Sequence, residues 1–288
     1  MQGPVRLRGD PYTFLKKGST LSSESPVQAP SCLPPPLKWA GGKRWLVPHL
    51  LPIWEKHRHR RLVEPFCGGL AVTLGLQPQR ALLNDVNPHL INFYRQLQSG
   101  LVLDGTMENA DGAFYASRQR FNHLIEEGRA ETPAAAALFY YLNRTGYNGL
   151  CRFNKSGFFN VPFGKYKTIN YTRDFRAYRP RLADWQFSCM AFDQLAPDRE
   201  DFIYADPPYD VEFTSYSRDG FTWKDQERLG RYLAGHPGPV VLSNQATERI
   251  IALYADLGFT LITLRAPRMI NNTGDRTSAI EVLATRNL

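Results

Sequence analysis

Short apolar runs alternate with amphipathic stretches along this 288-residue chain, and that alternation limits the possible folds more than any other feature. Strand-like runs occupy residues 61–66, 81–84, 201–205, 239–243, 259–264 and 279–284. Helical periodicity occupies residues 88–98, 113–142, 223–234 and 246–256. Strands separated by helices favour a parallel sheet covered on both faces. We therefore predict an α/β fold built on a doubly wound, mostly parallel sheet.

The last two strand-like runs depart from this pattern, because a Gly- and Asn-rich segment joins them instead of a helix. Parallel neighbours need a long crossover connection, whereas antiparallel neighbours can be joined by a loop. We therefore predict that the sheet ends in an antiparallel hairpin.

A different kind of sequence separates the second and third runs. Helical patterns dominate to about residue 142, and residues 144–180 are loop-like and dense in Gly, Asn and aromatic residues. We predict a mainly helical domain inserted at 88–174, with the sheet domain formed by 34–87 and 175–288.

The first 33 residues are rich in Ser, Pro, Gly and Lys and show no periodicity. Such a composition cannot bury a core, so we expect a disordered tail followed by the stiff Pro34–Pro36 run. No apolar run approaches the ~20 residues that span a bilayer, and the N-terminus lacks the apolar stretch of a secretory signal. We expect a soluble, cytoplasmic protein without a membrane partner.

The four cysteines, Cys32, Cys67, Cys151 and Cys189, have no CxxC spacing, and no histidine lies at zinc-finger distance from them. This pattern predicts neither a metal site nor a disulfide framework, and it suits a reducing compartment.

A glycine turn, Glu64 to Gly69, follows the first strand-like run. At the carboxyl end of a parallel strand such a turn lets a ligand approach the backbone, although an ordinary tight turn uses the same residues. Asp85 ends the next run, about 20 residues on, where an acidic side chain can bind a ribose hydroxyl pair. Asn87 and Pro88 make a helix N-cap an alternative role for Asp85, and both roles are compatible.

The sequence Asp206-Pro207-Pro208-Tyr209 follows the apolar run 201–205. The prolines lack backbone donors and fix the chain, which leaves the Pro207 carbonyl free to accept a hydrogen bond beside the Asp206 carboxylate. Tyr209 adds an aromatic face. These groups can accept hydrogen bonds from an amino group while stacking on its ring, as a flipped-out base requires. A proline-rich turn is the alternative.

A basic segment from Arg144 to Arg181 holds nine Lys or Arg residues, one acid (Asp174) and many aromatic residues. The whole chain carries a formal charge of +8, from 35 basic and 27 acidic residues. Cations that contact phosphates and rings that stack on bases indicate a nucleic-acid surface. A solvated basic face would not need so many aromatic residues.

From about Leu37 to its end, the chain resembles the Dam-type (D12 class) DNA adenine methyltransferases. The motifs that carry the resemblance are Lys38–Lys43 (KWAGGK), Leu62–Phe66 (LVEPF), Asn84–Asn87 (NDVN), Tyr141–Asn154 (YLNRTGYNGLCRFN), Phe159–Gly164 (FNVPFG) and Asp206–Tyr209 (DPPY). The resemblance implies a class I, Rossmann-like methyltransferase fold, in which the sheet domain is catalytic and the insert recognises the target.

The resemblance also implies S-adenosylmethionine as the methyl donor, with no metal. The residues it assigns to the cofactor are Trp39, Lys43, Phe66, Gly68, Asp85 and Asp206. Those it assigns to catalysis are Asp206, Pro207 and Tyr209, which would aim the lone pair of a flipped adenine's amino group at the methyl without a covalent intermediate.

The partner that the resemblance implies is double-stranded DNA, bound by a monomer associated with the nucleoid. The residues it assigns to DNA are Lys38, Arg144, Tyr147, Asn148, Leu150, Arg152, Pro162 and Tyr166. Tyr147 and Asn148 would occupy the gap left by the flipped base, and members of the family with this set commonly read GATC. Arginine suits that task because its fork matches the two major-groove acceptors of guanine.

Two departures from the family pattern are visible. Leu70 stands where the cofactor turn usually has a glycine, and we expect the loop to adjust; the stretch after Tyr209 is short. Two alternatives stay open at this point. One is amino methylation of cytosine or of RNA, and the other is a DNA-binding regulator that has lost its activity.

Overall fold

The computed structural model describes residues 33–209, 220–267 and 279–288. The predicted N-terminal tail, apart from Leu33, and the short stretch after Tyr209 lie outside the described residues. Residues Cys32–Leu288 form one compact unit. None of the described helices is long and apolar enough to cross a membrane.

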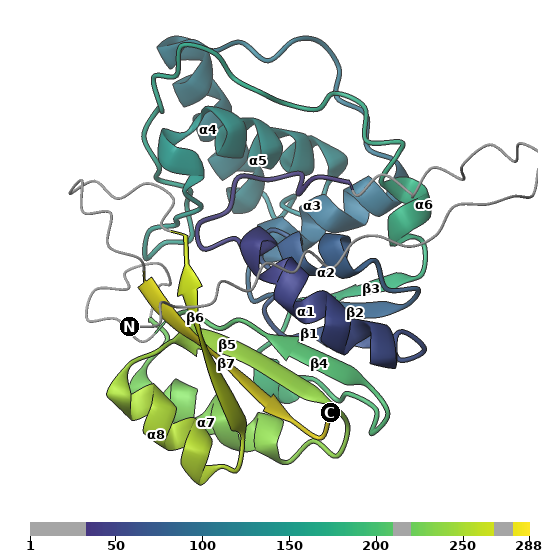
Figure 1. The fold of residues 1–288 in the computed structure, drawn as a ribbon. Coiled ribbons are helices and arrows are strands. Elements are labelled where there is room, and N and C mark those ends of the chain that lie inside the picture. The colour runs from purple at the N-terminus through teal and green to yellow at the C-terminus, as the bar shows by residue number, and fades with distance from the viewer. Residues whose placement is uncertain (1–32, 210–219, 268–278) are drawn as a thin grey trace, which may run out of the picture. The chain divides into compact units, whose positions relative to one another are not determined.

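Seven strands within the described ranges form one sheet, in the order β3-β2-β1-β4-β5-β7-β6 (Figure 1). Their bounds are β1 Leu62–Glu64, β2 Ala81–Asn84, β3 Trp185–Ser188, β4 Phe202–Ala205, β5 Val240–Gln245, β6 Thr260–Ala266 and β7 Ala279–Arg286. Strands β1 to β5 pair in parallel. Strand β7 lies between β5 and β6 and is antiparallel to both. The predicted mostly parallel sheet with an antiparallel end is confirmed.

The helices follow the predicted pattern, with additions. Their bounds are α1 Val47–Trp54, α2 Ala71–Leu76, α3 Pro88–Ser99, α4 Asp111–Glu126, α5 Pro133–Thr145, α6 Arg179–Leu182, α7 Trp223–Ala234 and α8 Glu248–Asp256. Short 3-10 turns occupy Arg44–Leu46, Glu55–His57, Tyr147–Gly149 and Phe192–Gln194. The helical stretch expected at 113–142 forms two helices, and Thr132, where the sequence predicts a helix start, caps the second by accepting from the Ala135 N–H. Strand β3 and helices α1, α2 and α6 were not predicted.

Helices cover both faces of the sheet. Successive residues of a strand point to opposite faces, so neighbouring residues of one strand pack against different helices. In β1, Leu62 packs in the cluster that includes Trp54 of α1. The next residue, Val63, packs in a second cluster with Leu229 of α7 and Ile250 of α8. The sheet is therefore doubly wound, as predicted.

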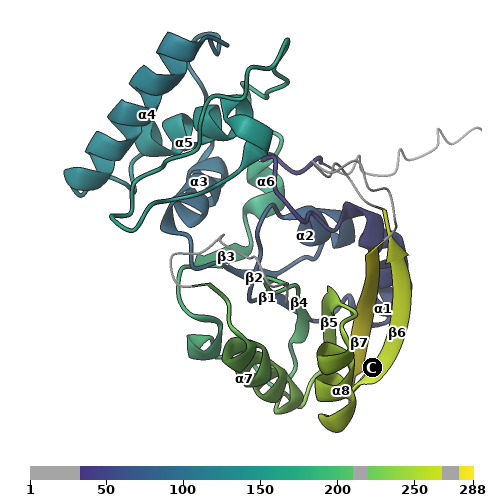
Figure 2. The same ribbon diagram turned by 90° about the vertical axis from the view of Figure 1, so that its left-hand side faces the viewer.

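The helical insert has an aromatic core. Phe93 of α3 stacks on Tyr140 of α5 with ring centroids 5.4 Å apart, and His89 stacks on Phe153 at 4.7 Å. Helix α3 lies between the sheet and the helices α4 and α5, which stand away from it (Figure 2). One apolar cluster runs from the sheet into these helices. The boundaries at residues 88 and 174 stay a prediction.

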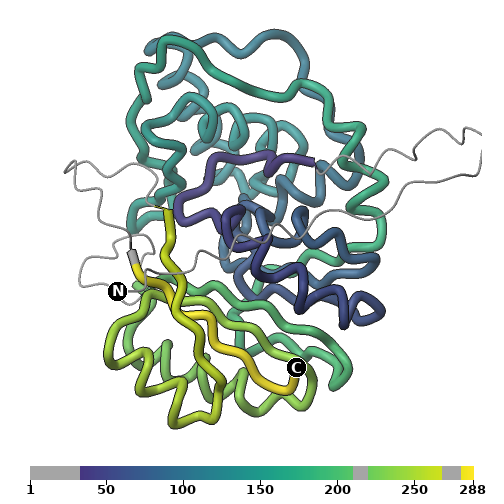
Figure 3. Tube along the Cα trace, viewed as in Figure 1, coloured from purple at the N-terminus to yellow at the C-terminus, as the bar shows by residue number. Residues whose placement is uncertain are grey.

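The segment before α1 runs beside helix α5, far from it in the sequence (Figure 3). The buried Asn143 side chain accepts from the Lys38 N–H at 2.9 Å and donates to the Lys38 carbonyl at 2.8 Å. One amide thus pairs with both backbone groups of Lys38, as a neighbouring strand would. This pairing fixes the N-terminal segment between the insert and the sheet.

Candidate active site

Acidic side chains gather around the carboxyl ends of the parallel strands. Glu64 ends β1, while Asp85 and Asp206 directly follow β2 and β4. Glu281 lies in β7, opposite the last residue of β5, Gln245. Ligands of open α/β sheets bind at this edge. The structure therefore places the two predicted acids, Asp85 and Asp206, where a ligand would lie. It brings Glu64 and Glu281 to the same edge.

Asp206 has both carboxylate oxygens engaged. Oδ1 accepts from the Ser243 hydroxyl at 2.8 Å, and Oδ2 lies 3.3 Å from the Lys43 ammonium. Ser243 is itself 2.9 Å from the Tyr204 hydroxyl in the buried sheet. Burial raises the pKa of Asp206, and Lys43 and Ser243 oppose that rise. Hydrogen bonds and a cation thus hold the carboxylate in one orientation.

Lys43 is buried and lies among several acceptors. Its Nζ donates to the Gly41 carbonyl at 3.0 Å and lies 3.7 Å from Glu281 Oε1. The same atom lies 4.5 Å from the centre of the Tyr209 ring. Lys43 therefore joins the Asp206–Tyr209 turn to the N-terminal segment and to β7.

A buried amide holds the turn at Pro207 and Pro208. Gln226 of α7 donates to the Pro208 carbonyl at 2.8 Å, and Asn244 of β5 donates to Gln226 at 3.0 Å. Among the hydrogen bonds of the described residues, none is donated to the Pro207 carbonyl. The role of that carbonyl as the acceptor beside Asp206 stays a prediction.

The cofactor turn carries Trp39 on its surface. A Cβ atom at Gly68 would lie 2.7 Å from the Trp39 Nε1, so only glycine leaves room for this contact. The Gly68 N–H donates to Asp85 Oδ2 at 3.2 Å, and the Tyr94 hydroxyl donates to the Gly68 carbonyl at 2.5 Å. Trp39, Gly68 and Asp85 are brought together as predicted.

Leu70 keeps the backbone turn for which the family uses glycine. Its φ is 60° and its ψ is 23°, a left-handed conformation that costs a non-glycine residue about 1–2 kcal/mol. The side chain is fully buried in the core, and that burial offsets the strain. Leu70 thus adopts a left-handed conformation that glycine adopts at a lower cost.

Asp85 does not cap helix α3. The cap is Asn87, whose side chain accepts from the backbone of His89 and Leu90. Asp85 Oδ1 instead accepts from the Asn87 N–H at 3.0 Å. Burial raises the pKa of Asp85 to about 6. Its position at the tip of β2 fits the role of a hydroxyl acceptor.

The predicted recognition residues lie on one folded loop. The N–H of Tyr147 donates to the Pro162 carbonyl at 2.9 Å, which brings the two halves of the loop together. Tyr147, Asn148, Arg152 and Pro162 are exposed, and Leu150 is half-buried. Exposed side chains on a paired loop can contact a ligand without a large rearrangement.

Other predicted DNA contacts are engaged within the protein. The Arg144 guanidinium donates from Nε and Nη2 to the Asn170 carbonyl. Lys38 Nζ donates to the Arg144 carbonyl at 3.1 Å and lies 3.8 Å from the centre of the Tyr166 ring. Burial lowers the pKa of Lys38. These contacts orient the two side chains within the protein, and their assignment to DNA stays a prediction.

The carboxyl end of the sheet fits a cationic ligand. Asp206 and Glu281 share the one lysine, Lys43, that lies within ion-pair distance of them among the described residues. The sulfonium of S-adenosylmethionine would supply further positive charge there. In the described ranges, no three His, Cys, Asp or Glu side chains are arranged to hold a metal ion.

Sequence reasoning missed Glu64, Glu281, Ser243 and Asn143. Glu64 is buried and accepts from the Thr73 hydroxyl. A lone acid within the apolar run 279–284 was a visible signal for Glu281. Nothing local marks Asn143 or Ser243, because their partners lie on distant segments.

The amino-acid sequence matches a known protein family. The model of the D12 class N6 adenine-specific DNA methyltransferase family matches residues 39–270. The Retron Ec67 DNA adenine methylase of Escherichia coli is 37% identical over 264 residues, which cover 86% of this chain and 90% of that protein. The DNA adenine methylase of Vibrio cholerae O395 is 34% identical over 268 residues, covering 86% and 94%. That of Escherichia coli K12 is 32% identical over 269 residues, covering 86% and 93%.

Proposed function

The chain belongs to the D12 class N6 adenine-specific DNA methyltransferase family and is a DNA adenine methyltransferase. From that premise we propose that it moves a methyl group from S-adenosylmethionine to a flipped-out adenine in double-stranded GATC. We propose further that a single chain performs the reaction. Nothing in the site favours cytosine, RNA or an inactive binding protein over this function.

The observation that carries the proposal is the setting of Asp206. Its carboxylate is held by Ser243 and Lys43 beside the Pro207 carbonyl, and Tyr209 follows in the same turn. The amino nitrogen of adenine is a poor nucleophile because its lone pair is delocalised into the ring. Two acceptors that take hydrogen bonds from that amino group localise the lone pair and orient it.

Bound S-adenosylmethionine supplies a methyl group already activated by the sulfonium, so the protein has mainly to bind and orient the two reactants. Trp39, on the glycine turn, covers the adenosine side of the site. Asp85 accepts hydrogen bonds from the ribose. Phe66, which is half-buried after β1, contributes apolar contact. Lys43 and Asp206 lie at the reacting end.

A base inside a duplex cannot reach Asp206, so the target adenine has to leave the stack. Tyr147 and Asn148 are exposed in the 3-10 turn Tyr147–Gly149 that follows helix α5. Asn148 has a left-handed φ of 52°, which turns the chain sharply there. We propose that these two side chains fill the gap left in the duplex and that the flipped base stacks on the ring of Tyr209.

Arg152 is the proposed reader of guanine. Its side chain is exposed, with Nε donating to Asn160 Oδ1 at 2.8 Å and Nη2 to the Asn160 carbonyl at 3.3 Å. These contacts orient the guanidinium and leave Nη1 for a base edge. Lys38, Leu150 and Pro162 occupy the other places that the family uses to read GATC.

The test measures transfer of labelled methyl from S-adenosylmethionine to duplexes that contain GATC or a one-base variant of it. We expect label on the adenine of GATC, and host DNA that resists a nuclease blocked by GATC methylation. Label on cytosine or on RNA, or no label at all, would overturn the proposal. Label on adenine in another sequence would overturn only the GATC assignment.

Arg152→Ala tests the readout, with Lys165→Ala and Lys167→Ala as exposed, basic controls. A bidentate base contact is worth about 1–3 kcal/mol of discrimination, so Arg152→Ala should relax the choice at one guanine. The lysine variants should weaken binding to all sequences alike and reduce its salt dependence. An unchanged site preference in Arg152→Ala would contradict the assignment.

A further inference from the structure

Two buried polar atoms near the reacting end lack a hydrogen bond. They are Glu281 Oε2 and the Tyr209 hydroxyl oxygen, neither of which has a partner of ordinary geometry among the described residues. A buried polar group without a partner costs free energy, so such groups mark places where a contact forms in another state of the protein. One of these atoms is an acceptor and the other can donate.

Glu281 is an unusual residue for its position. Its neighbour in β7, Val282, is buried, and the glutamate itself is only 7% exposed. The Glu281 Oε1 atom lies 3.7 Å from Lys43 Nζ. A carboxylate inside an apolar strand is retained only where a partner compensates its burial. Lys43 is a partial partner, since it lies closer to Asp206.

Tyr209 lies next to both groups. Its ring is 4.5 Å from Lys43 Nζ. Burial raises the pKa of Glu281, and Lys43 and a hydrogen-bonding interaction with Tyr209 oppose that rise. Burial also raises the pKa of Tyr209, so its hydroxyl keeps its proton and acts as a donor. The hydroxyl therefore interacts with the carboxylates of both Glu281 and Asp206, and it makes no hydrogen bond of ordinary geometry within the described residues.

We propose that Glu281 is a positioning residue for methyl transfer: one carboxylate oxygen holds the Lys43 ammonium, and the other accepts the Tyr209 hydroxyl when the substrates bind. The inference rests on the proposed function. Glu281 touches neither reactant. It fixes the tilt of the Tyr209 ring, on which the flipped adenine stacks, and the place of Lys43 beside Asp206.

Substitutions can separate the two contacts. Tyr209→Phe keeps the ring and removes the hydroxyl, Glu281→Met removes both contacts, and Glu281→Gln keeps an acceptor but loses the charge. In single-turnover methyl transfer, loss of a hydrogen bond to a charged group should make Tyr209→Phe about tenfold slower than the parent. In the Glu281→Met background, Tyr209→Phe should have no further effect. Glu281→Gln should retain a rate between those of the parent and Glu281→Met.

A second readout does not depend on turnover. A duplex with 2-aminopurine at the target position, bound with S-adenosylhomocysteine, reports base stacking by its fluorescence. Tyr209→Phe and Glu281→Met should shift this fluorescence in the same direction, and the double variant should match Glu281→Met. Calorimetry should show weaker S-adenosylmethionine binding in Glu281→Met, through Lys43, and unchanged binding in Tyr209→Phe.

Thr285→Val is the matched control, since Thr285 is buried on the same face of β7 and its hydroxyl donates to the Thr260 carbonyl. It should leave rate and fluorescence at parent values. If Tyr209→Phe slows both backgrounds equally, or slows neither, the inference is wrong. A parent that methylates no adenine would overturn the proposed function instead. If Glu281→Met does not fold, the same comparison is made in the Glu281→Gln background. There Tyr209→Phe should slow methyl transfer less than it does in the parent.

Discussion

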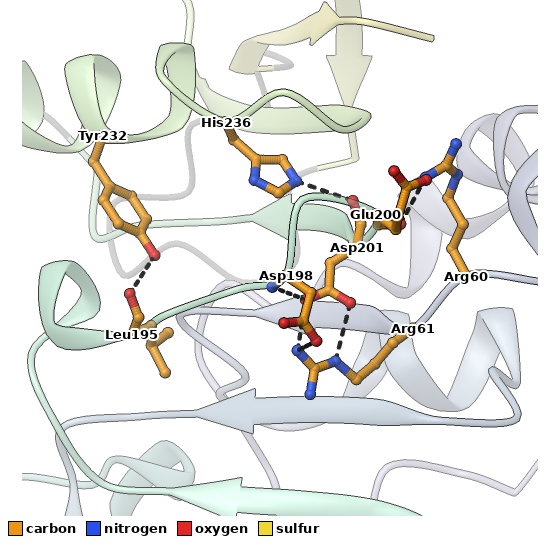
Figure 4. Close-up of polar contacts among 8 residues, drawn as sticks. All are labelled: Arg60, Arg61, Leu195, Asp198, Glu200, Asp201, Tyr232 and His236. Carbon is orange, nitrogen blue, oxygen red and sulfur yellow. Dashed lines mark hydrogen bonds and ion pairs between the residues drawn. The ribbon is translucent and has the colours of Figure 1, made fainter.

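Buried acidic side chains have different partners at the two ends of the sheet. At the amino end, before β1 and β4, the buried acid Asp201 pairs with Arg61 and accepts from the Asp198 N–H (Figure 4). At the carboxyl end, Asp206 and Glu281 share Lys43, and Glu64 pairs with a hydroxyl. Both ends belong to the same strands, so the difference lies in the side chains and not in the backbone.

The amino end is a closed network. Arg61 donates from Nε and Nη2 to the two oxygens of Asp201, at 3.0 and 2.6 Å, and also reaches Asp198 at 3.1 Å. The Asp198 N–H donates to Asp201 at 2.7 Å, and the His236 ring lies 3.0 Å from the Asp201 carbonyl. A bidentate arginine pair of this geometry ties β1 to β4.

The carboxyl end holds buried acids with fewer partners. Burial raises the pKa values of Glu64, Asp85, Asp206 and Glu281. Acids that lack full compensation destabilise the free protein, and a cationic ligand relieves that cost when it binds. The comparison indicates that the amino end serves stability and the carboxyl end serves the reaction. Variants at the two ends should therefore fail in different assays.

The largest effect is expected for Asp206→Ala. Loss of one preorganised electrostatic contact usually costs ~10²-fold or more in rate, and this carboxylate acts on the amino group of the base. Methyl transfer should fall by that factor while duplex binding and thermal stability persist. Asp206→Asn controls for size. Turnover above about a tenth of the parent rate in Asp206→Ala would contradict the role of Asp206.

Arg61→Met should lower the stability of the protein and leave the rate of methyl transfer unchanged. Asp201 is only 3% exposed and would lose its arginine partner. Breaking a buried pair costs about 3–5 kcal/mol, and we expect about 2–3 kcal/mol here because Arg61 itself is partly exposed. Denaturant unfolding should show the loss, and kcat measured well below the unfolding temperature should match the parent. A lower kcat at unchanged stability would contradict the comparison.

Glu64→Gln should change how stability depends on pH. Burial raises the pKa of Glu64 to about 8, from an ordinary value of 4.5. The folded state therefore holds this proton more tightly than the unfolded chain does. The stabilisation is fully present below about pH 4.5 and is lost as pH rises toward 8, by at most about 1.4 kcal/mol per pH unit.

Glutamine cannot ionise and still accepts from Thr73, so the variant should lose less stability than the parent between pH 6 and pH 9. Unfolding curves at both pH values measure this difference. Asp198→Asn, an acidic position at the amino end with an exposed side chain, is the control and should leave the pH dependence near that of the parent. An identical pH dependence in Glu64→Gln and the parent would show that Glu64 does not titrate in this window.

The sequence predicts the central strands because their signal is local. Apolar runs mark β1, β2, β4 and β5, and the position of an acid after such a run places Asp85 and Asp206 at one edge of the sheet. Strand β3 gives little signal, since it has four residues and is partly exposed. Helix α1 was missed because it contains two prolines, one of them in its interior.

Contacts between distant segments explain the other differences. The place of β7 between β5 and β6 is set by pairing across the sheet and not by its own residues. The same pairing brings Glu281 to Lys43, which no local pattern shows. The resemblance assigns Arg144 to DNA, and no local pattern shows that its Nε and Nη2 donate to the Asn170 carbonyl.

The smallest effect is expected for Glu200→Ala, which tests whether burial or pairing makes the amino end stable. Glu200 forms an ion pair with Arg60 at 3.0 Å, next in the chain to the pair between Arg61 and Asp201, but its side chain is 76% exposed. Water solvates both charges in the unpaired state, so an exposed pair contributes about 0–1 kcal/mol. Arg60 also donates to the Glu200 backbone carbonyl at 2.7 Å, a bond that the substitution keeps. The free energy of unfolding should therefore change by less than about 0.5 kcal/mol and turnover not at all, measured beside Arg61→Met. A loss as large as that of Arg61→Met would mean that the amino end is stabilised by the number of its ion pairs and not by the burial of Asp201.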